Sequence, residues 1–291
     1  MRSSLYLTLL TFLLSVSTVS ASNIFDTFQR LADPNSKEGK ILAGATQVVS
    51  SAKEIDYPTE RTIGEGLALE GLKRFGNPVR NEALQQYVNL VGTAVATNSK
   101  RATIPYQFAV LDSRVQNAFA VPGGVIFVSR ALVATLDNEA ELAAVLSHEI
   151  GHVSAKHALK TIQRTQLLQG AGTITAASIG GDKGKNLASA IGELQSVLFD
   201  QGLDKNMEFE ADLAAMETTY RTGYNPYAMI TVLEKLQKLE ASSKNKKGSW
   251  FSTHPPLSER IERLKSELRK YPDYSTLATL HDRFVKQTKT K

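Results

Sequence analysis

Residues 148–152 carry the pattern H-E-x-x-H inside a segment whose composition predicts a helix. Residues four apart lie on one face of a helix, so His148 and His152 can bind the same metal ion. Glu149 is one position further round and can hold a water molecule on that metal. The pattern is typical of a zinc site in which the metal activates water and the glutamate takes its proton. The alternative is a pair of surface histidines on an ordinary amphipathic helix.

The neighbouring sequence predicts that this helix is buried on most of its circumference. Asn138 and Glu141 form an N-x-x-E start similar to a capping box, and apolar residues then recur at helical spacing. Unpaired polar groups in a protein interior are costly, so a buried helix with two histidines and a glutamate needs a partner such as a metal. Gly151 lies in mid-helix, where glycine costs about 1 kcal/mol relative to alanine, so we expect another backbone to approach it closely. We expect the helix to run to about residue 169.

A catalytic zinc site needs a third protein ligand, with the fourth position left for water. His157 is the nearest candidate, but it lies five residues past His152, about 140° round the helix. We therefore expect His157 to pack or bond locally rather than to bind the metal.

Glu208 is the better candidate for the third ligand. Residues 206–216 read as a second helix, on which Glu208 and Asp212 share a face and Glu210 points to the far side. Glu208 can bind zinc, and Asp212 can hold a ligand histidine or a substrate group one turn further on. Taken alone, the same pattern also fits a solvated acidic helix face.

Five sequence blocks, in order along the chain, carry a family resemblance that covers roughly residues 60 to 270. The blocks are N-A-F-A-x-P-G-G at 117–124, H-E-x-G-H-x-x-x-x-H at 148–157, E-x-x-A-D at 208–212, G-Y-[DN]-P at 223–226 and T-H-P-x-x-x-x-R-I at 253–261. Together they resemble the zinc metallopeptidases of the gluzincin family that includes HtpX, BepA and the CAAX prenyl proteases. The resemblance implies an α+β, mostly α-helical, zincin-like domain with a small β-sheet whose edge strand lies beside the active-site helix.

The resemblance also implies roles for particular residues. It makes His148, His152 and Glu208 the ligands of one zinc ion per chain and Glu149 the general base. The implied activity is that of a zinc metalloendopeptidase.

Three further residues match family positions near the site. Asp212 matches a second acid or ligand-orienting group, and His254 and Arg260 match residues that approach the metal. His254 and Arg260 would stabilise the oxyanion, and Tyr224 is a further candidate for that role. Alternatively, His254 would cap the zinc in a resting state. The local sequence equally fits His254 as a helix-entry residue before two prolines.

The sequence also predicts where substrate binds. Residues 115–121 and 125–129 are rich in β-formers and flank a Pro-Gly-Gly turn, which predicts a hairpin, and residues 106–112 alternate as in a strand. A sheet edge can take an extended peptide as an added strand. The resemblance places four substrate-binding residues on that edge, and unfolded chains are then the expected substrates; a plain structural hairpin is the alternative. The four residues are Asn117, Ala118, Phe119 and Ala120.

The N-terminus predicts export from the cytoplasm. Arg2 precedes an apolar run over residues 5–16 and a small-residue cleavage site, which together read as a signal peptide cut after Ala21. The run is too short for a confident membrane span, no other run is long enough, and the chain has no cysteine to lipidate. We expect a periplasmic protein without a stable transmembrane anchor, with secretion as the alternative. Cleavage removes Arg2 and no acid, so the net charge of +5 falls to +4, which does not favour nucleic acid as a partner.

We expect three segments: a signal peptide (1–21), an N-terminal arm (22–60) with a helix at 41–55, and a metallopeptidase domain (61–291). Helices are expected at 65–75, 80–97, 206–222, 226–241, 257–270 and 275–287. The glycine-rich residues 170–205 are expected to form two mobile helical segments over the cleft, as a lid; the alternatives are a plain loop-rich connection and a segment that loosely contacts a membrane. Too few residues follow position 250 for the TPR array of BepA-like proteins.

The function that these predictions favour is quality control of the bacterial envelope. The protease would cleave unfolded or misassembled envelope proteins, with outer-membrane proteins among the candidates, by analogy with the family. The alternative is a latent or inactive metallopeptidase fold that acts as a chaperone-like binder of envelope proteins, with the metal site capped by His254 or by the glycine-rich segment.

Overall fold

The computed structural model describes residues 56–161, 195–242, 249–254 and 257–289. The predicted signal peptide, the predicted helix at 41–55 and most of the glycine-rich segment lie outside these residues. Within the described ranges, no helix is both long enough and apolar enough to cross a bilayer.

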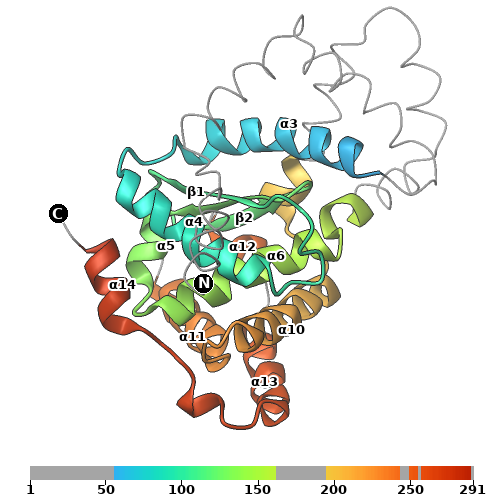
Figure 1. Ribbon diagram of the computed structural model, residues 1–291. Coiled ribbons are helices and arrows are strands. Elements are labelled where there is room, and N and C mark those ends of the chain that lie inside the picture. The colour runs from blue at the N-terminus through green and yellow to red at the C-terminus, as the bar shows by residue number, and fades with distance from the viewer. Residues whose placement is uncertain (1–55, 162–194, 243–248, 255–256, 290–291) are drawn as a thin grey trace, which may run out of the picture.

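A three-stranded sheet of order β1-β3-β2 lies at the centre of the molecule (Figure 1). The strands are β1 (Gln107–Leu111), β2 (Ala118–Val121) and β3 (Val125–Ser129). β2 and β3 pair antiparallel around the turn at 122–124, as the sequence predicts, and β1 pairs parallel to β3. β2 is therefore an edge strand, with one side unpaired by any other described strand.

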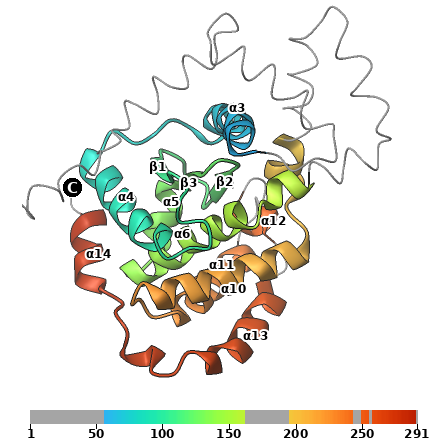
Figure 2. The ribbon, with the colours of Figure 1, turned by 45° about the vertical axis from the view of Figure 1, so that its right-hand side comes forward.

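Helices cover both faces of this sheet (Figure 2). The helix α3 (Tyr57–Phe75) lies on one face, and α4 (Glu82–Ala96) and α6 (Glu139–Ser154) lie on the other. The alternation of strand residues explains the two layers, since Phe119 and Phe127 are buried with the residues of α3 whereas Ile126 is buried with those of α4 and α6. The structure thus has the predicted α+β class, with helix in the majority.

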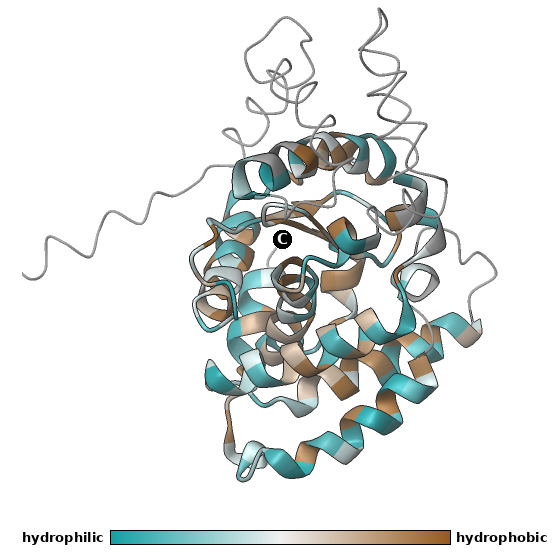
Figure 3. Ribbon diagram, turned by 90° about the vertical axis from the view of Figure 1, so that its right-hand side faces the viewer, coloured by the Kyte–Doolittle hydropathy of each residue, from teal (hydrophilic) through white to brown (hydrophobic). Residues whose placement is uncertain are grey.

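A second group of helices supports α6 from below (Figure 1). The longest, α10 (Lys205–Arg221), packs along α6 and is followed by α11 (Tyr227–Ser242), α13 (Leu257–Glu267) and α14 (His281–Thr288). In Figure 3 these helices are hydrophobic where they face one another and hydrophilic on their outer turns. The predicted helices at 80–97, 206–222, 226–241 and 257–270 are confirmed, the last ending in a 3₁₀ turn (Leu268–Lys270).

The contact between α6 and α10 passes through Gly151. A Cβ atom at this position would lie 3.1 Å from the Cα atom of Ala211 and 3.2 Å from its carbonyl oxygen. The close approach of another backbone, which the sequence predicts for Gly151, is therefore confirmed.

Several predicted helix boundaries differ from those in the structure. The helix that starts after the Asn138 cap is interrupted at Ser154, where Lys156 takes a positive φ of 55°; residues 157–161 are helical again, and 162–169 lie outside the described residues. The helix predicted at 65–75 begins at Tyr57, and the one predicted at 275–287 is a 3₁₀ turn (Tyr274–Thr276) followed by α14. Three short elements were not predicted, since few residues define them: α5 (Arg130–Thr135), the π-helical turn η1 (Val197–Gln201) and α12 (Trp250–Thr253).

A buried ion pair fastens α3 to the hairpin turn. Glu60 is 1% exposed and accepts hydrogen bonds from both terminal nitrogens of Arg101 and, at 3.2 Å, from the backbone N–H of Gly123. Arg101 also donates to the carbonyl of Val153 near the end of α6. The pair therefore fixes the edge strand and the histidine helix relative to each other.

Candidate metal centre

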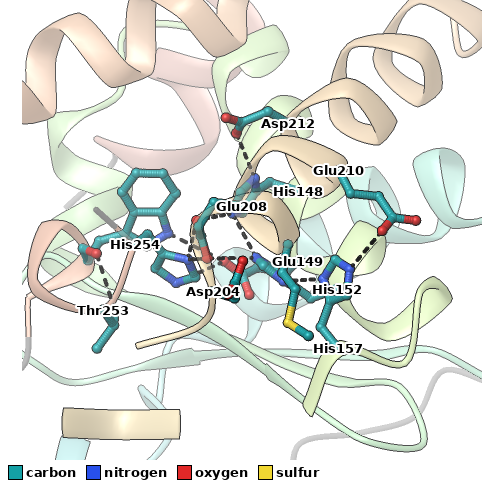
Figure 4. A network of polar contacts seen from close by, with 12 residues as sticks. His148, Glu149, His152, His157, Asp204, Glu208, Glu210, Asp212, Thr253 and His254 are labelled. Carbon is teal, nitrogen blue, oxygen red and sulfur yellow. Dashed lines mark hydrogen bonds and ion pairs between the residues drawn. The ribbon is translucent and has the colours of Figure 1, made fainter. Parts of the chain in front are cut away.

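Four buried side chains from three elements converge on one point (Figure 4). α6 supplies His148 and His152, α10 supplies Glu208, and the residue that ends α12 supplies His254. Each offers one ligand atom, and these atoms all lie within 4.8 Å of one another. The structure thus brings together the three predicted ligands and adds His254 as a fourth donor.

The contacts around the two helix histidines leave their Nε2 atoms as the metal-facing ligand atoms. His148 Nδ1 lies 3.0 Å from Asp212 Oδ1, and His152 Nδ1 lies 2.9 Å from His157 Nδ1. The two Nε2 atoms are 3.0 Å apart, and the Glu208 carboxylate oxygens lie 3.6 Å and 3.5 Å from them. With both imidazoles neutral, two lone pairs and a carboxylate would face one another, which favours a cation between them, and this nitrogen and oxygen donor set suits zinc.

The electrostatics of the cluster favour a positive charge at its centre. Burial opposes ionisation of Glu208, but the charges of His254 and Arg260 outweigh it and hold the Glu208 pKa well below its usual range. Burial likewise works against protonated His148, but its contacts with Asp212 and Glu208 raise its pKa to about 9.

His152 behaves in the opposite way. Burial, reinforced by the nearby charge of His148, holds the pKa of His152 well below its usual value despite the opposing effect of Glu208. The neutral imidazole is the form that binds a metal.

Asp212 and Arg260 form a buried support behind the ligands. Arg260 donates from Nε and Nη2 to the two oxygens of Asp212 at 2.7 Å and 2.6 Å, and from Nη1 to the carbonyl of His254 at 2.6 Å. Nη1 also lies 3.1 Å from Glu208 Oε2. All three guanidinium nitrogens of Arg260 thus contact Asp212, Glu208 or the His254 backbone. Asp212 lies against His148, as expected for a ligand-orienting group.

Trp250 is a site residue that the sequence analysis missed. Its indole Nε1–H donates to Glu149 Oε1 at 3.4 Å, its ring stacks on His254 with centroids 4.6 Å apart, and Arg260 lies 4.7 Å from its ring centroid. It is the only tryptophan in the chain and lies four residues before His254, which is the one signal that the sequence offered.

His157 contacts the site although the helical angle predicted otherwise. The prediction assumed an uninterrupted helix, in which His157 would lie about 140° round from His152. The turn at Lys156 interrupts the helix, and His157 Nδ1 lies against His152 Nδ1. The expected local bonding of His157 is therefore seen. Burial lowers the pKa of His157, and Glu210 partly offsets that effect.

A cleft with an empty volume of about 510 Å³ opens beside the metal centre. Glu149, His152 and His254 lie in its wall. Most of the remaining lining is apolar and comes from β2, from the residues after α6 and from the η1 region: Phe119, Ala120, Val121, Leu159, Phe199 and Leu203.

Not every predicted residue reaches the cleft. Of the four predicted substrate-binding residues, Phe119 and Ala120 line it, whereas Asn117 and Ala118 are buried and do not. Tyr224 is far from the metal centre along α6, because its hydroxyl donates to Glu139 in the first turn of that helix. Arg260 is not in the cleft wall either. Neither residue lines the cleft, so the oxyanion role that the sequence analysis gives to Tyr224 and Arg260 stays a prediction.

Comparison with known proteins agrees with this geometry. The sequence model for peptidase family M48 matches residues 82–268, which is more than half of the chain. The chain belongs to peptidase family M48. The predicted family is confirmed by this match, and relatives of the chain carry the names metalloprotease and metalloendopeptidase.

The alignments with known relatives cover only part of each relative. The chain is 28% identical over 269 residues to the beta-barrel assembly-enhancing protease of Yersinia pestis, which covers 85% of this chain and 54% of the relative. It is 30% identical over 190 residues to the protein of that name from Escherichia coli K12, covering 63% of this chain and 38% of the relative. It is 33% identical over 165 residues to the metalloprotease LoiP of that strain, covering 56% of this chain and 63% of LoiP. The chain therefore spans about half the length or less of the assembly-enhancing proteases that it matches.

Proposed function

We propose that this chain is a zinc-dependent endopeptidase that hydrolyses peptide bonds in extended polypeptide segments. The observation that carries the proposal is the convergence of His148 Nε2, His152 Nε2 and the Glu208 carboxylate beside a cleft that has Glu149 and His152 in its wall and an edge strand at its border. One zinc ion per chain would be held by these three residues.

The edge strand β2 would align the substrate peptide along the cleft. An extended peptide would add to the free side of β2, where backbone hydrogen bonds require no particular side chains. Phe119 and Ala120 line the cleft at this strand, and the apolar side chains across from them favour substrates with apolar residues near the scissile bond. Such segments are exposed in unfolded or misassembled proteins and buried in folded ones.

The chemistry divides between the metal and Glu149. Zinc, when bound, polarises the scissile carbonyl and lowers the pKa of a water molecule to about 7. Glu149 takes a proton from that water at its carboxylate and passes it to the leaving amine. Trp250 holds Oε1 of Glu149 in place, and Asp212 holds His148 with its Nε2 turned to the metal. Arg260 acts through Asp212 and Glu208 as a positioning residue.

A second candidate function rests on the position of His254. Its Nδ1 lies 3.0 Å from both oxygens of Glu208, and it belongs to the same cluster of potential ligands. In this arrangement His254 would take the fourth zinc position that catalysis reserves for water. The protein would then be latent, or a chaperone-like binder, until α12 moves; in the open state His254 becomes a candidate to stabilise the oxyanion.

The proposed setting is the periplasm, after cleavage of the signal peptide behind Ala21, with residues 61–291 as the peptidase domain. The proposed substrates are unfolded or misassembled envelope proteins, including outer-membrane proteins. Relatives named as beta-barrel assembly-enhancing proteases support this role by analogy. The small net charge supports no nucleic-acid partner.

The test compares purified protein lacking residues 1–21 with its Glu149→Gln and His254→Ala variants. Cleavage of casein and of an unfolded outer-membrane protein is measured beside zinc content. We expect the parent to bind one zinc and cleave, and Glu149→Gln to bind zinc without cleaving. If the parent is inactive and His254→Ala cleaves, the latent state is the correct description. If the parent holds no zinc, or if Glu149→Gln cleaves as fast as an active parent, the proposed mechanism fails.

A further inference from the structure

The two helix histidines of the metal centre are supported in different ways. His148 has the Asp212 carboxylate directly on its Nδ1, at 3.0 Å. His152 has no carboxylate on its Nδ1; instead His157 Nδ1 lies 2.9 Å away, and His157 Nε2 lies 3.2 Å from Glu210 Oε2 (Figure 4). The mechanism described so far gives these last two residues no role.

The chain geometry that makes this contact is local and costs free energy. Lys156 takes a positive φ of 55° directly after the end of α6, in a region that residues with a side chain rarely adopt. The helix resumes at residue 157 after this turn, and the His157 ring lies against His152, with centroids 5.0 Å apart. His157 is 1% exposed, so this polar ring is buried where only hydrogen bonds can compensate it.

The order of donors along this chain of three groups follows from Glu210. A carboxylate only accepts, so His157 Nε2 carries the proton and donates to Glu210. In the neutral ring His157 Nδ1 is then the acceptor, and His152 Nδ1–H donates to it. This leaves the lone pair of His152 on Nε2, which is the atom that faces His148 Nε2 and Glu208.

We propose that His157 and Glu210 are positioning residues that hold His152 in the Nδ1–H tautomer and present its Nε2 to the metal. The relay replaces the direct carboxylate that His148 has, with a second histidine as spacer. Outer partners of this kind orient metal-bound histidines and raise their basicity. The proposal rests on the proposed zinc site.

Neither residue touches the substrate cleft. The lining of the cleft includes His152 but not His157 or Glu210. Glu210 is half exposed and lines a separate polar depression with Lys100, Glu217 and Arg221 on another side of α6. Substitutions at the outer end of the relay can therefore change metal binding without changing substrate contacts.

The experiment measures zinc affinity by chelator competition, together with the absorption spectrum of the cobalt-substituted protein, for four variants of the full protein. His157→Leu removes the acceptor for His152. His157→Asn keeps an acceptor oxygen near the place of Nδ1 but loses the hydrogen bond to Glu210. Glu210→Gln keeps a neutral acceptor at a half-exposed position that tolerates change. Glu217→Gln is the matched control, since it lies on the exposed face of the same helix and touches no relay residue.

We expect His157→Leu to bind zinc roughly 10- to 100-fold more weakly and to alter the cobalt spectrum. His157→Asn should recover part of that loss, Glu210→Gln should lose a smaller factor, and Glu217→Gln should match the parent. The proposal is overturned if His157→Leu and Glu210→Gln keep parental affinity and spectrum, or if His157→Asn is no better than His157→Leu. A parent protein that binds no zinc would instead overturn the proposed function itself.

Discussion

Glu149 depends on one neighbour for its direction. It is 1% exposed, and its Oε1 accepts the indole N–H of Trp250 at 3.4 Å while His254 Nε2 lies 3.9 Å away. A general base must point its oxygen at the proton that it takes, and the indole N–H fixes the direction of this carboxylate. Trp250 is therefore the residue through which α12 acts on the proposed chemistry.

We predict that Trp250→Phe lowers kcat about tenfold with little change in KM. The substitution removes a hydrogen bond to a charged group, worth about 1.5 kcal/mol, and keeps a ring against His254 and Arg260. Steady-state kinetics on an unfolded substrate, with zinc content measured in parallel, check this. Parental kcat with full zinc would show that the indole does not position the base, and a protein without zinc would show that Trp250 supports the ligands instead.

At the scale of single residues, the sequence predicts which side chains share one face of a helix, but it does not predict contacts between distant parts of the chain. His148 with His152, and Glu208 with Asp212, are four apart on two helices, so their shared faces could be predicted from spacing alone. Trp250 is 101 residues from Glu149, and no local pattern connects such a pair. His157 is near in sequence, but its position depends on the positive φ of one preceding residue, which a lysine does not signal.

At the scale of elements, the metal centre depends on a close contact between α6 and α10 at Gly151. Gly151 lies one residue before His152, and Ala211 lies three residues after Glu208, so this contact is within one turn of the ligands. The absence of a side chain at Gly151 thus sets the distance between the histidines and Glu208. Helix propensity alone disfavours glycine at such a position by about 1 kcal/mol relative to alanine.

We predict that Gly151→Ala weakens zinc binding at least severalfold although alanine favours helix. The new Cβ would lie 3.1 Å from Ala211 Cα, so α10 and Glu208 must shift by a few tenths of an ångström. Gly92→Ala is the matched control, because its Cβ would meet the Phe108 ring at 2.6 Å, in a helix that supplies no ligand. Zinc affinity by chelator competition should fall for Gly151→Ala only, whereas thermal unfolding reports overpacking in both. Equal zinc affinities for the two variants would contradict the prediction.

The elements themselves were predictable where their periodicity is long. The helices at 82–96, 205–221 and 227–242 were anticipated within a few residues, and the hairpin followed from its Pro-Gly-Gly turn. α12 has four residues and η1 five, and packing against other parts of the chain defines both. Gly202, with a φ of 79°, brings the end of η1 against Thr253, since a Cβ there would lie 2.5 Å from the Thr253 carbonyl oxygen. The cleft wall beside the ligands is therefore made partly by elements that local sequence does not specify.

At the scale of the whole molecule, Glu139 connects the start of the histidine helix to the last helix. It is 1% exposed and accepts hydrogen bonds from Tyr87 of α4, at 2.8 Å, from Tyr224, at 2.5 Å, and from Arg283 of α14. Phe284 of α14 is fully buried beside Tyr87, with ring centroids 6.4 Å apart. The network thus holds α4, α6 and α14 together at the opposite end of α6 from the ligand histidines.

This network makes a stability prediction with a definite pH dependence. Burial alone would raise the pKa of Glu139, but the hydrogen bonds from Arg283, Tyr224 and Tyr87 outweigh it and hold the pKa below its usual value of 4.5. A carboxyl group whose folded pKa is depressed stabilises the fold fully above the unfolded pKa, and this contribution disappears as pH falls through the folded pKa. The free energy of unfolding should therefore depend on the charge of Glu139 at neutral pH and not in acid.

We predict that Glu139→Gln lowers the free energy of unfolding by about 2 kcal/mol at pH 7, the value of hydrogen bonds to a charged group. The difference from the parent should stay constant down to about pH 5 and shrink as the pH falls below 4.5. Chemical denaturation of both proteins at several pH values measures it, and the subtraction cancels groups that titrate alike in both. Arg283→Gln should show the same trend, because it removes the partner and not the carboxyl. A difference that persists unchanged at pH 3 would mean that Glu139 acts by shape and not by charge.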